Sequence, residues 1–422
     1  MPGIYTEMKL RALDIAFGVL ITASVLVVVF IAGVFAIEAF SYANRERSLS
    51  FSPVIDGASW IVKWGGPRYD SCLAIAIDSS GDLYVAGEFQ GVADFNPGWG
   101  TEWHTAGEIQ GYFLGRFSPN GNRRWLETWQ ADCRYEHWQD GAMDLAFDPS
   151  NVVYVIGREM FTRSLNLSGG LEGVLSRDIQ GAAIASDGSG NVYTFDPKLP
   201  LRKFASYGEL LWERTPASVY GIVTGGDMLV DSNGFICFAY ESLEKRNPDG
   251  ELVWSSELPG TAEGLAMDGL GNLYAAGLMF GHMGTDLETG SDPALEANKN
   301  MCFFMKFSTE GKVLWSRSWA SSAWAVAATA AGDVYVAGTL SGDSDFDPGP
   351  GECRRHSSRS GVYTSVAFLS KFDSEGDFQW VRLGNEWSSG QGAAVDSEGN
   401  VYLAGSTHGD AFLAKFAPDG GF

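Results

Sequence analysis

A short turn motif recurs seven times along most of the chain. Its pattern is Asp-x-x-Gly-x-(Leu/Val)-Tyr, and the copies lie at residues 78–84, 148–154, 187–193, 231–237, 268–274, 329–335 and 396–402. Three copies deviate, with Asn151 for Gly, Ile236 and Cys237 for Leu/Val and Tyr, and Thr329 for Asp. Asp and Gly at these offsets are typical of a tight hairpin turn, in which Gly or Asn accepts a positive φ angle. Runs of apolar and β-branched residues flank the turns, so each copy predicts two antiparallel strands.

A second pattern follows most copies of the turn. An aromatic residue is followed by Gly four residues later and by Trp eight residues later, as in Phe117-Gly121-Trp125, Phe204-Gly208-Trp212, Phe307-Gly311-Trp315 and Phe372-Gly376-Trp380, with Arg246-Gly250-Trp254 as a variant. The last copy, Phe416-Gly420, stops at Phe422 before its Trp, and the segment Trp60–Trp64 at the other end resembles the missing strand. A repeat array whose first strand completes its last unit predicts a closed ring, because closure removes free sheet edges.

These patterns predict an all-β fold, a seven-bladed β-propeller with four strands per blade, over residues 58–422. The ring is expected to be closed by the Trp60 strand. Each blade would hold a Trp strand, an Ala-rich strand, a Tyr strand and a Lys-Phe strand. The second unit is degenerate, since residues 156–180 carry neither the Lys-Phe pair nor the Trp. The repeated Tyr and Trp residues are expected to pack between neighbouring blades.

An apolar stretch precedes the repeats. Residues 15–37 carry no charge, and roughly 20 apolar residues suffice to cross a bilayer core. We therefore predict an N-terminal tail and one transmembrane α-helix in residues 1–43, with the helix at about 14–40, followed by a linker at 44–57. A cleaved signal peptide is the alternative. Lys9 and Arg11 on one flank match Arg45 and Arg47 on the other, so the charge count leaves the orientation open, and the short tail favours a head outside the cytoplasm.

The repeats resemble a known family. Fragments such as AIDSSGDLYVAGEF, AFLSKFDSEGDFQW and AVDSEGNVYLAG are similar to the bacterial β-propeller repeat often called SBBP, and the resemblance extends over about residues 60–422. It implies an extracytoplasmic propeller with a binding role and implies no reaction. The segment Gly208–Trp212 also resembles quinoprotein-type repeats, but those usually form eight-bladed rings.

Charge and cysteine content exclude several classes of protein. The formal net charge is −23, and residues 1–50 sum to zero, so the whole excess lies on the head. Such a head repels nucleic acid and favours cations or basic partners. The five cysteines show no metal-ligand spacing, and a bridge between Cys72 and Cys133 is possible in an oxidising compartment.

Long inserts are the expected place for function. Three of them, at about 88–111, 278–301 and 339–366, separate a Tyr strand from a Lys-Phe strand, so they should project from one side of the ring and form one arc. The third insert contains Asp343, Asp345 and Asp347 ahead of Gly349, a spacing that resembles the start of a calcium loop. Calcium is the one cofactor that the sequence suggests, and a rigid acidic turn is the alternative.

No catalytic motif stands out, and the five histidines are scattered. The sequence therefore favours a non-enzymatic, membrane-anchored extracytoplasmic module. Its loops and transmembrane helix would contact other subunits of a larger membrane complex, and the helix would contact the lipid bilayer. Two alternatives stay open, an envelope polysaccharide hydrolase or lyase and a surface adhesin or filament subunit.

Overall fold

The computed structural model describes residues 57–421 apart from residues 97, 99, 108–109, 131–142, 158–159, 166–170, 177–180, 217–224, 280–300 and 358–363. The chain divides into two compact units, Met1–Ser52 and Pro53–Phe422, and all described residues belong to the second. The predicted membrane helix and nearly all of the predicted linker therefore lie outside the described residues. Within the described part, no helix has the length and apolar character that a membrane span needs.

Seven four-stranded antiparallel sheets make up the described unit, and they are numbered here in the order of their turn motifs. Sheet 1 consists of β2 (Asp70–Ile77), β3 (Leu83–Phe89), β6 (Gly111–Phe117) and β7 (Arg123–Gln130). Sheet 2 consists of β8 (Met143–Phe147), β9 (Val153–Gly157), β10 (Met160–Leu165) and β11 (Leu171–Ser176). Sheet 3 consists of β12 (Ala183–Ser186), β13 (Val192–Asp196), β14 (Leu199–Phe204) and β15 (Leu210–Arg214). Sheets 4 and 5 consist of β16 (Asp227–Val230), β17 (Ile236–Ala239), β18 (Ser242–Arg246) and β19 (Leu252–Glu257); and β20 (Gly260–Met267), β21 (Leu273–Met279), β22 (Cys302–Phe307) and β23 (Val313–Trp319).

The last sheet is completed by the first strand of the unit. Sheets 6 and 7 consist of β24 (Ser322–Ala328), β25 (Val334–Ser341), β28 (Ser365–Phe372) and β29 (Phe378–Glu386); and β30 (Ser388–Val395), β31 (Val401–Thr407), β32 (Asp410–Phe416) and β1 (Trp60–Trp64). Two short hairpins, β4 (Val92–Asp94) with β5 (Trp103–Thr105) and β26 (Asp343–Asp345) with β27 (Arg354–His356), extend from sheets 1 and 6.

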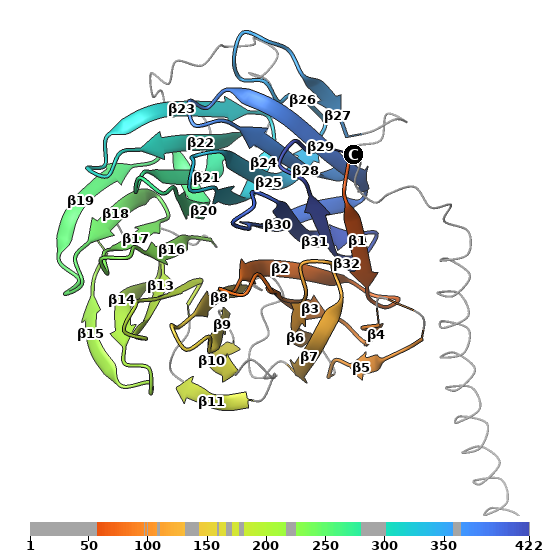
Figure 1. Ribbon diagram of the computed structural model, residues 1–422, viewed down its shortest axis with the longest axis horizontal. Helices are drawn as coiled ribbons and strands as arrows, with labels where there is room; N and C mark the ends of the chain where they lie inside the picture. Colours follow the sequence, from red (N-terminus) through yellow and green to blue (C-terminus); the bar gives the residue numbers. More distant parts are fainter. Residues whose placement is uncertain are drawn as a thin grey trace, which may run out of the picture. The chain divides into compact units, whose positions relative to one another are not determined.

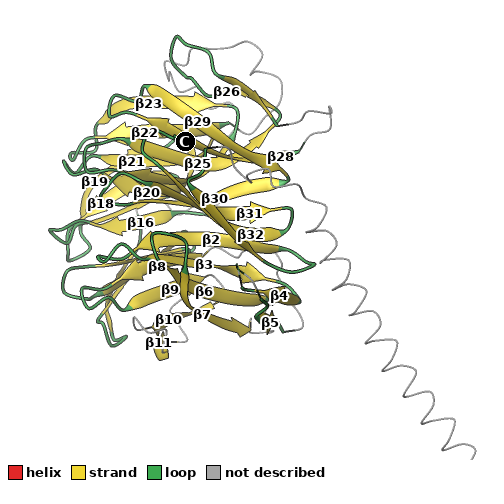
Figure 2. Ribbon diagram, turned by 45° about the vertical axis from the view of Figure 1, so that its right-hand side comes forward, coloured by secondary structure: helices red, strands yellow, loops and turns green. Residues whose placement is uncertain are grey.

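The sheets stand around a common axis, with one strand of each innermost (Figure 1). These innermost strands are β2, β8, β12, β16, β20, β24 and β30; each contacts the next, and β30 contacts β2. This is an all-β propeller, as the repeats predict, and strands and loops fill the described part (Figure 2). The predicted closure is confirmed, because β1 pairs with β32 in a register that sets Trp60 opposite Lys415.

The turn motif is explained by bonds within each sheet. In sheet 3, Asp187 Oδ1 accepts hydrogen bonds from the backbone N–H groups of Ser189 and Asn191, at 2.9 and 3.0 Å, while Gly190 adopts a φ of 79°. The Tyr193 hydroxyl donates to Asp187 Oδ2 at 2.8 Å. The Lys203 ammonium lies 3.5 Å from the same carboxylate and 5.0 Å from the centroid of the Tyr193 ring. In this sheet, Asp, Gly, Tyr and Lys all take part in the contacts that hold one turn.

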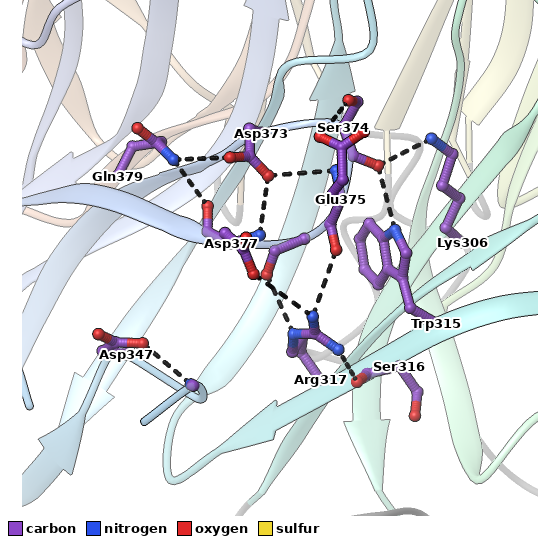
Figure 3. Close-up of polar contacts among 12 residues, drawn as sticks. Lys306, Trp315, Ser316, Arg317, Asp347, Asp373, Ser374, Glu375, Asp377 and Gln379 are labelled. Carbon is purple, nitrogen blue, oxygen red and sulfur yellow. Dashed lines mark hydrogen bonds and ion pairs between the residues drawn. The ribbon is translucent and has the colours of Figure 1, made fainter. Parts of the chain in front are cut away.

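The second motif joins neighbouring sheets. The Trp315 indole of sheet 5 donates to the carbonyl of Ser374 in sheet 6 at 3.1 Å and lies against Gly376, where an added Cβ would come within 2.9 Å of the ring (Figure 3). Arg317 donates to the Gly376 carbonyl at 3.0 Å. We call this contact of a Trp indole with a Gly and a carbonyl of the next sheet the latch. Trp60 forms it with Gly121, Trp254 with Gly311 and Trp380 with Gly420. The prediction that the repeated Trp residues pack between blades is therefore confirmed at these positions.

Sheet 2, the degenerate unit, is held by other contacts. The ladders of β10 with β9 and β11 contain register shifts. Phe147 meets Tyr84 of sheet 1 edge-on, with ring centroids 4.8 Å apart. On the other side, Asp144 Oδ2 accepts a hydrogen bond from the backbone N–H of Ile184 in sheet 3 at 2.8 Å. These contacts join sheet 2 to both neighbours.

Of the possible bridge from Cys72 to Cys133, the second residue lies outside the described residues. Cys72 is a free thiol that is fully buried beneath the closing strand, among the side chains that surround Trp64 and Leu413. It fills a small apolar space, a common role for a buried cysteine.

The closing latch gives a direct test of ring closure. Replacing Trp60 by Ala removes the indole that covers Gly121 and its bond to Pro119, and we expect a loss of about 2 kcal/mol in the free energy of unfolding, measured by denaturant titration. The matched control is Trp387→Ala, which removes an indole that is 57% exposed and should change the stability little. Equal effects of the two substitutions would show that the closing strand does not stabilise the ring.

Candidate functional site

Four of the innermost strands carry an extra residue at the same position. The ladders β2–β3, β20–β21, β24–β25 and β30–β31 each slip by one residue there, and the extra residues are Leu73, Glu263, Trp324 and Gln391. A β-bulge redirects a side chain away from the regular pleat and is frequent beside binding sites. Sheets 5, 6, 7 and 1 follow one another around the ring, so the four residues, here called the bulge arc, occupy one continuous segment of it.

A glycine three residues after the motif Tyr allows each bulge. An added Cβ on Gly338 would lie 2.0 Å from the carbonyl oxygen of Ser322, and Gly87, Gly277 and Gly405 show the same close approach. Sheets 3 and 4 have Asp196 and Tyr240 at this position, and the ladders β12–β13 and β16–β17 run without a slip. The sequence signal for the bulge is therefore the Ala-Gly pair in LYVAG, LYAAG, VYVAG and VYLAG.

Hydroxyl groups connect two members of the bulge arc. The Trp324 indole donates to Thr339 Oγ1 at 3.0 Å, and this hydroxyl lies 2.6 Å from Ser389 Oγ. Gln391 donates its amide to the same Ser389 oxygen at 2.8 Å. All four side chains are partly exposed. The bonds fix an aromatic ring and an amide beside each other at the junction of sheets 6 and 7, which suits recognition of a polar ligand or a polypeptide.

Two acidic side chains lie on the innermost strands of sheets 2 and 4. Besides the bond from Ile184, Asp144 accepts one from its neighbour Leu145 at 2.7 Å, and Asp227 accepts bonds from Met228 and Leu265, both at 2.7 Å. Burial raises the pKa of Asp144 well above its usual range, and the negative charge of Asp227 adds to the rise. Burial also raises the pKa of Asp227, to about 6. Both residues as a whole are partly exposed.

The insert hairpins lie at the same end of the sheets as the bulge arc. The first insert follows Phe89 at the end of β3, which pairs with Asp70 at the start of β2, three residues before the bulge. The third insert follows β25 in the same way. We call this end of the ring the insert face and the end with the repeated Asp turns the turn face. The predicted projection of these two inserts from one side is confirmed, and most of the insert at 278–301 lies outside the described residues.

Each hairpin is locked by one carboxylate and one Phe. Asp94 Oδ1 accepts the N–H groups of Asn96 and Glu102, at 3.0 and 2.7 Å. Asp345 Oδ1 accepts those of Asp347 and Cys353, at 3.1 and 2.7 Å. The Phe that follows each Asp is buried against its own sheet, and an Asn or Asp two residues after the locking Asp caps the next Gly. The motif Asp-Phe-(Asn/Asp)-Pro-Gly is therefore a rigid turn.

The three predicted calcium ligands are engaged in different contacts. Asp345 caps the hairpin, Asp347 Oδ1 accepts the N–H of Gly349 at 2.9 Å, and Asp343 lies 2.7 Å from Nδ1 of His356. Among the described residues, no three Asp, Glu, His or Cys side chains gather as a metal site would require. Calcium binding at Asp343, Asp345 and Asp347 thus lacks support in the geometry and stays a prediction.

The insert face also exposes large aromatic side chains. Tyr69 is 43% exposed, Trp103 on β5 is 48% exposed, and Trp387 between β29 and β30 is 57% exposed. Trp387 adopts a φ of 60°, which a bulky residue rarely does, and its carbonyl accepts the N–H of His408 at 2.8 Å. Tyr69 lies in the connection from β1 to β2, Trp103 lies in the hairpin that extends from sheet 1, and Trp387 lies in the connection from β29 to β30. Sequence reasoning missed them, because exposure was not visible in the repeat.

Comparisons with known proteins support the fold. A family model described as a β-propeller repeat, SBBP, matches residues 382–412. Comparison with curated protein sequences gives no significant match. The structure is similar to a catalytically inactive virginiamycin B lyase from Staphylococcus aureus solved with quinupristin, with a TM-score of 0.51 and 9% identity over 85% of this chain and 99% of that one. It is also similar to the WD40 domain of Neurospora crassa Pan2, with a TM-score of 0.47 and 11% identity over 84% and 95% of the two chains.

The glycine beneath the bulge can be tested by substitution. Gly338→Ala places a methyl group 2.0 Å from the Ser322 carbonyl, so the bulge must rearrange, and we expect a loss of about 2 kcal/mol or more in the free energy of unfolding. The matched control is Gly188→Ala in a turn of sheet 3, where an added Cβ meets nothing within 4 Å. A Gly338 variant as stable as the Gly188 variant would contradict this account of the bulge.

Proposed function

We propose that the chain is a non-enzymatic, membrane-anchored propeller that binds another protein through its insert face. The observation that carries the proposal is the exposure of Tyr69, Trp103 and Trp387 in connections at the insert face. Solvent-exposed Trp and Tyr side chains are the residues that most often dominate protein interfaces, since they bury much area at a low entropic cost. The locked hairpins favour the same conclusion, because a rigid loop loses little freedom when it binds.

The anchored location is part of the same proposal. The uncharged segment 15–37 would hold the head at the extracytoplasmic side of the membrane, and the partner would be another subunit of a larger membrane complex. The head carries the whole formal charge of −23, which favours a partner with a basic surface.

We also propose that sheet 2 is a full member of the ring, so that the propeller has seven blades. Support comes from β8, which contacts β2 on one side and β12 on the other. The family resemblance is proposed to extend beyond residues 382–412 to all units that carry the turn motif.

The binding proposal is tested by cross-linking and affinity purification from native membranes. The full chain should recover a fixed set of other chains, and a triple variant with Tyr69, Trp103 and Trp387 replaced by Ala should recover them at least about tenfold less well, because each aromatic anchor contributes on the order of 2 kcal/mol. The matched control replaces Tyr207 and Leu270 by Ala, which are 73% and 81% exposed on the turn face. A lone monomer after every extraction would contradict the proposal.

Asp144 and Asp227 favour a second candidate function, the hydrolysis or elimination of an acidic or neutral envelope polysaccharide. Such reactions use one carboxyl as an acid and one as a base, and the raised pKa values suit that division of roles. This candidate predicts release of reducing ends or of unsaturated products, rising as the pH passes about 6 and lost in Asp144→Asn and Asp227→Asn, with Asp249→Asn, an exposed turn residue, as the control. The binding proposal predicts no release above that of heat-inactivated protein.

A further inference from the structure

The outer rim of three adjacent sheets exposes pairs of aliphatic side chains. They occupy the two positions before the latch Trp, and their exposed fractions lie between 41% and 51%: Leu210 and Leu211 in sheet 3, Leu252 and Val253 in sheet 4, and Val313 and Leu314 in sheet 5. These six side chains, here called the aliphatic belt, are most of the exposed large apolar residues of the described chain outside the insert face. Sheets 1 and 6 carry Arg123-Arg124 and Phe378-Gln379 at these positions.

A bulge leaves the second residue of each pair outside the strand ladder. In sheet 4, Arg246 pairs with Leu252 and Lys245 pairs with Trp254, which leaves Val253 outside the ladder. Leu211 and Leu314 are left out in the same way. The strands β15, β19 and β23 are also the outermost of their sheets, at the rim of the ring (Figure 1). A bulged edge disfavours the addition of a further strand, so the surface offers side chains more than backbone groups.

The three pairs form one continuous surface. The Trp212 ring of sheet 3 lies against Gly250, two residues before Leu252, and the Trp254 ring of sheet 4 lies against Gly311, two residues before Val313. The latch therefore holds the aliphatic pair of one sheet next to the aliphatic pair of the following sheet. The exposed apolar area is on the order of several hundred Å², which equals the largest patch of a typical monomer and usually marks a binding surface.

The charges beside the belt indicate what covers it. Six exposed acidic residues and two exposed basic residues border it on the same strands and turns, namely Glu209, Glu213, Asp249, Glu251, Glu257 and Glu310, with Arg214 and Lys312. Two copies of this surface would repel each other, because both are acidic. An anionic membrane would repel it for the same reason. A partner with apolar side chains flanked by Lys or Arg would meet it with opposite charges.

We propose that the aliphatic belt is a second docking surface, distinct from the insert face, that binds a basic amphipathic segment of another protein. The apolar side of that segment covers the six aliphatic side chains, and its Lys or Arg residues approach the bordering carboxylates. Since the belt runs across three sheets, the segment lies along the circumference of the ring. Trp212, Trp254 and Trp315 stand directly after the belt residues and are partly exposed, so they report binding through their fluorescence.

The proposal is tested with synthetic peptides that contain no Trp. The probe is an amphipathic peptide of Leu and Lys with Leu at helical spacing; one reference peptide has Glu in place of Lys and another has Ser in place of Leu. The full chain is kept in solution with a mild detergent at one fixed concentration, and binding is followed by anisotropy of the labelled peptide and by Trp fluorescence. We expect saturable binding of the Leu and Lys peptide that weakens with added salt, and much weaker binding of both references.

A variant with Leu211, Leu252 and Leu314 replaced by Ser should bind the Leu and Lys peptide at least about tenfold more weakly. The reason is that the peptide would no longer cover the exposed apolar surface, about half of each Leu side chain, that these residues provide. The matched control replaces Arg124 and Gln379, the equivalent positions of sheets 1 and 6, by Ser and should bind like the parent chain. Thermal unfolding verifies that both variants fold. Equal binding by the triple variant, or equal binding of the Glu peptide, would overturn the proposal. The proposal would also be overturned if the parent chain self-associates, or sediments with anionic vesicles, and the triple variant does not. The belt would then bind a second copy of the chain or a membrane.

Discussion

The pairing of β1 with β32 is the contact on which the remaining architecture depends. Strands from the two ends of the head form one sheet, with Trp60 opposite Lys415 and Trp64 opposite Ala411. The closing strand also reaches sheet 1, since Gly65 exchanges backbone hydrogen bonds with Asp94 of the first insert, at 2.8 and 3.1 Å. An open array would leave two exposed sheet edges, and the latch would lack a partner at both ends. Closure therefore fixes the neighbour relation between sheets 7 and 1 on which the continuity of the bulge arc depends.

Much of this architecture could be predicted from the sequence because the repeated residues serve local bonds. The Asp, Gly and Tyr of the turn act within one hairpin, so their spacing is visible in a single copy, and the Trp60 segment could be matched to the unfinished last unit. The bulge arc escaped prediction although the Gly after Tyr-x-Ala is visible in the sequence, because the close approach of this Gly to the carbonyl of another strand requires coordinates. Calcium binding was inferred from alternating carboxylates, but spacing alone cannot distinguish a carboxylate that binds metal from one that caps backbone N–H groups, as Asp345 does.

The two ends of the ring differ in how strongly the fold restricts the residue types at their positions. On the turn face, Asp, Tyr and Lys contact one another in sheets 3, 5 and 7, and the sheet-to-sheet latch uses the carbonyls of the same end. A ligand there would have to compete with bonds that hold the ring together. On the insert face, each bulge needs only a Gly on the second strand, and the identity of the extra residue is unconstrained, as the series Leu73, Glu263, Trp324 and Gln391 illustrates.

This difference gives a physical reason for placing function at the insert face and at the rim. Fold-determining bonds are concentrated where the repeat is most regular, and side chains vary where the bonds leave them free. The belt follows the same logic, because the bulge before each latch Trp leaves the second residue exposed in sheets 1, 3, 4, 5 and 6, and only sheets 3, 4 and 5 place aliphatic pairs there. Three adjacent sheets expose apolar side chains to solvent at positions where equivalent sheets carry Arg or Gln. A binding partner explains this exposure better than the requirements of the fold do.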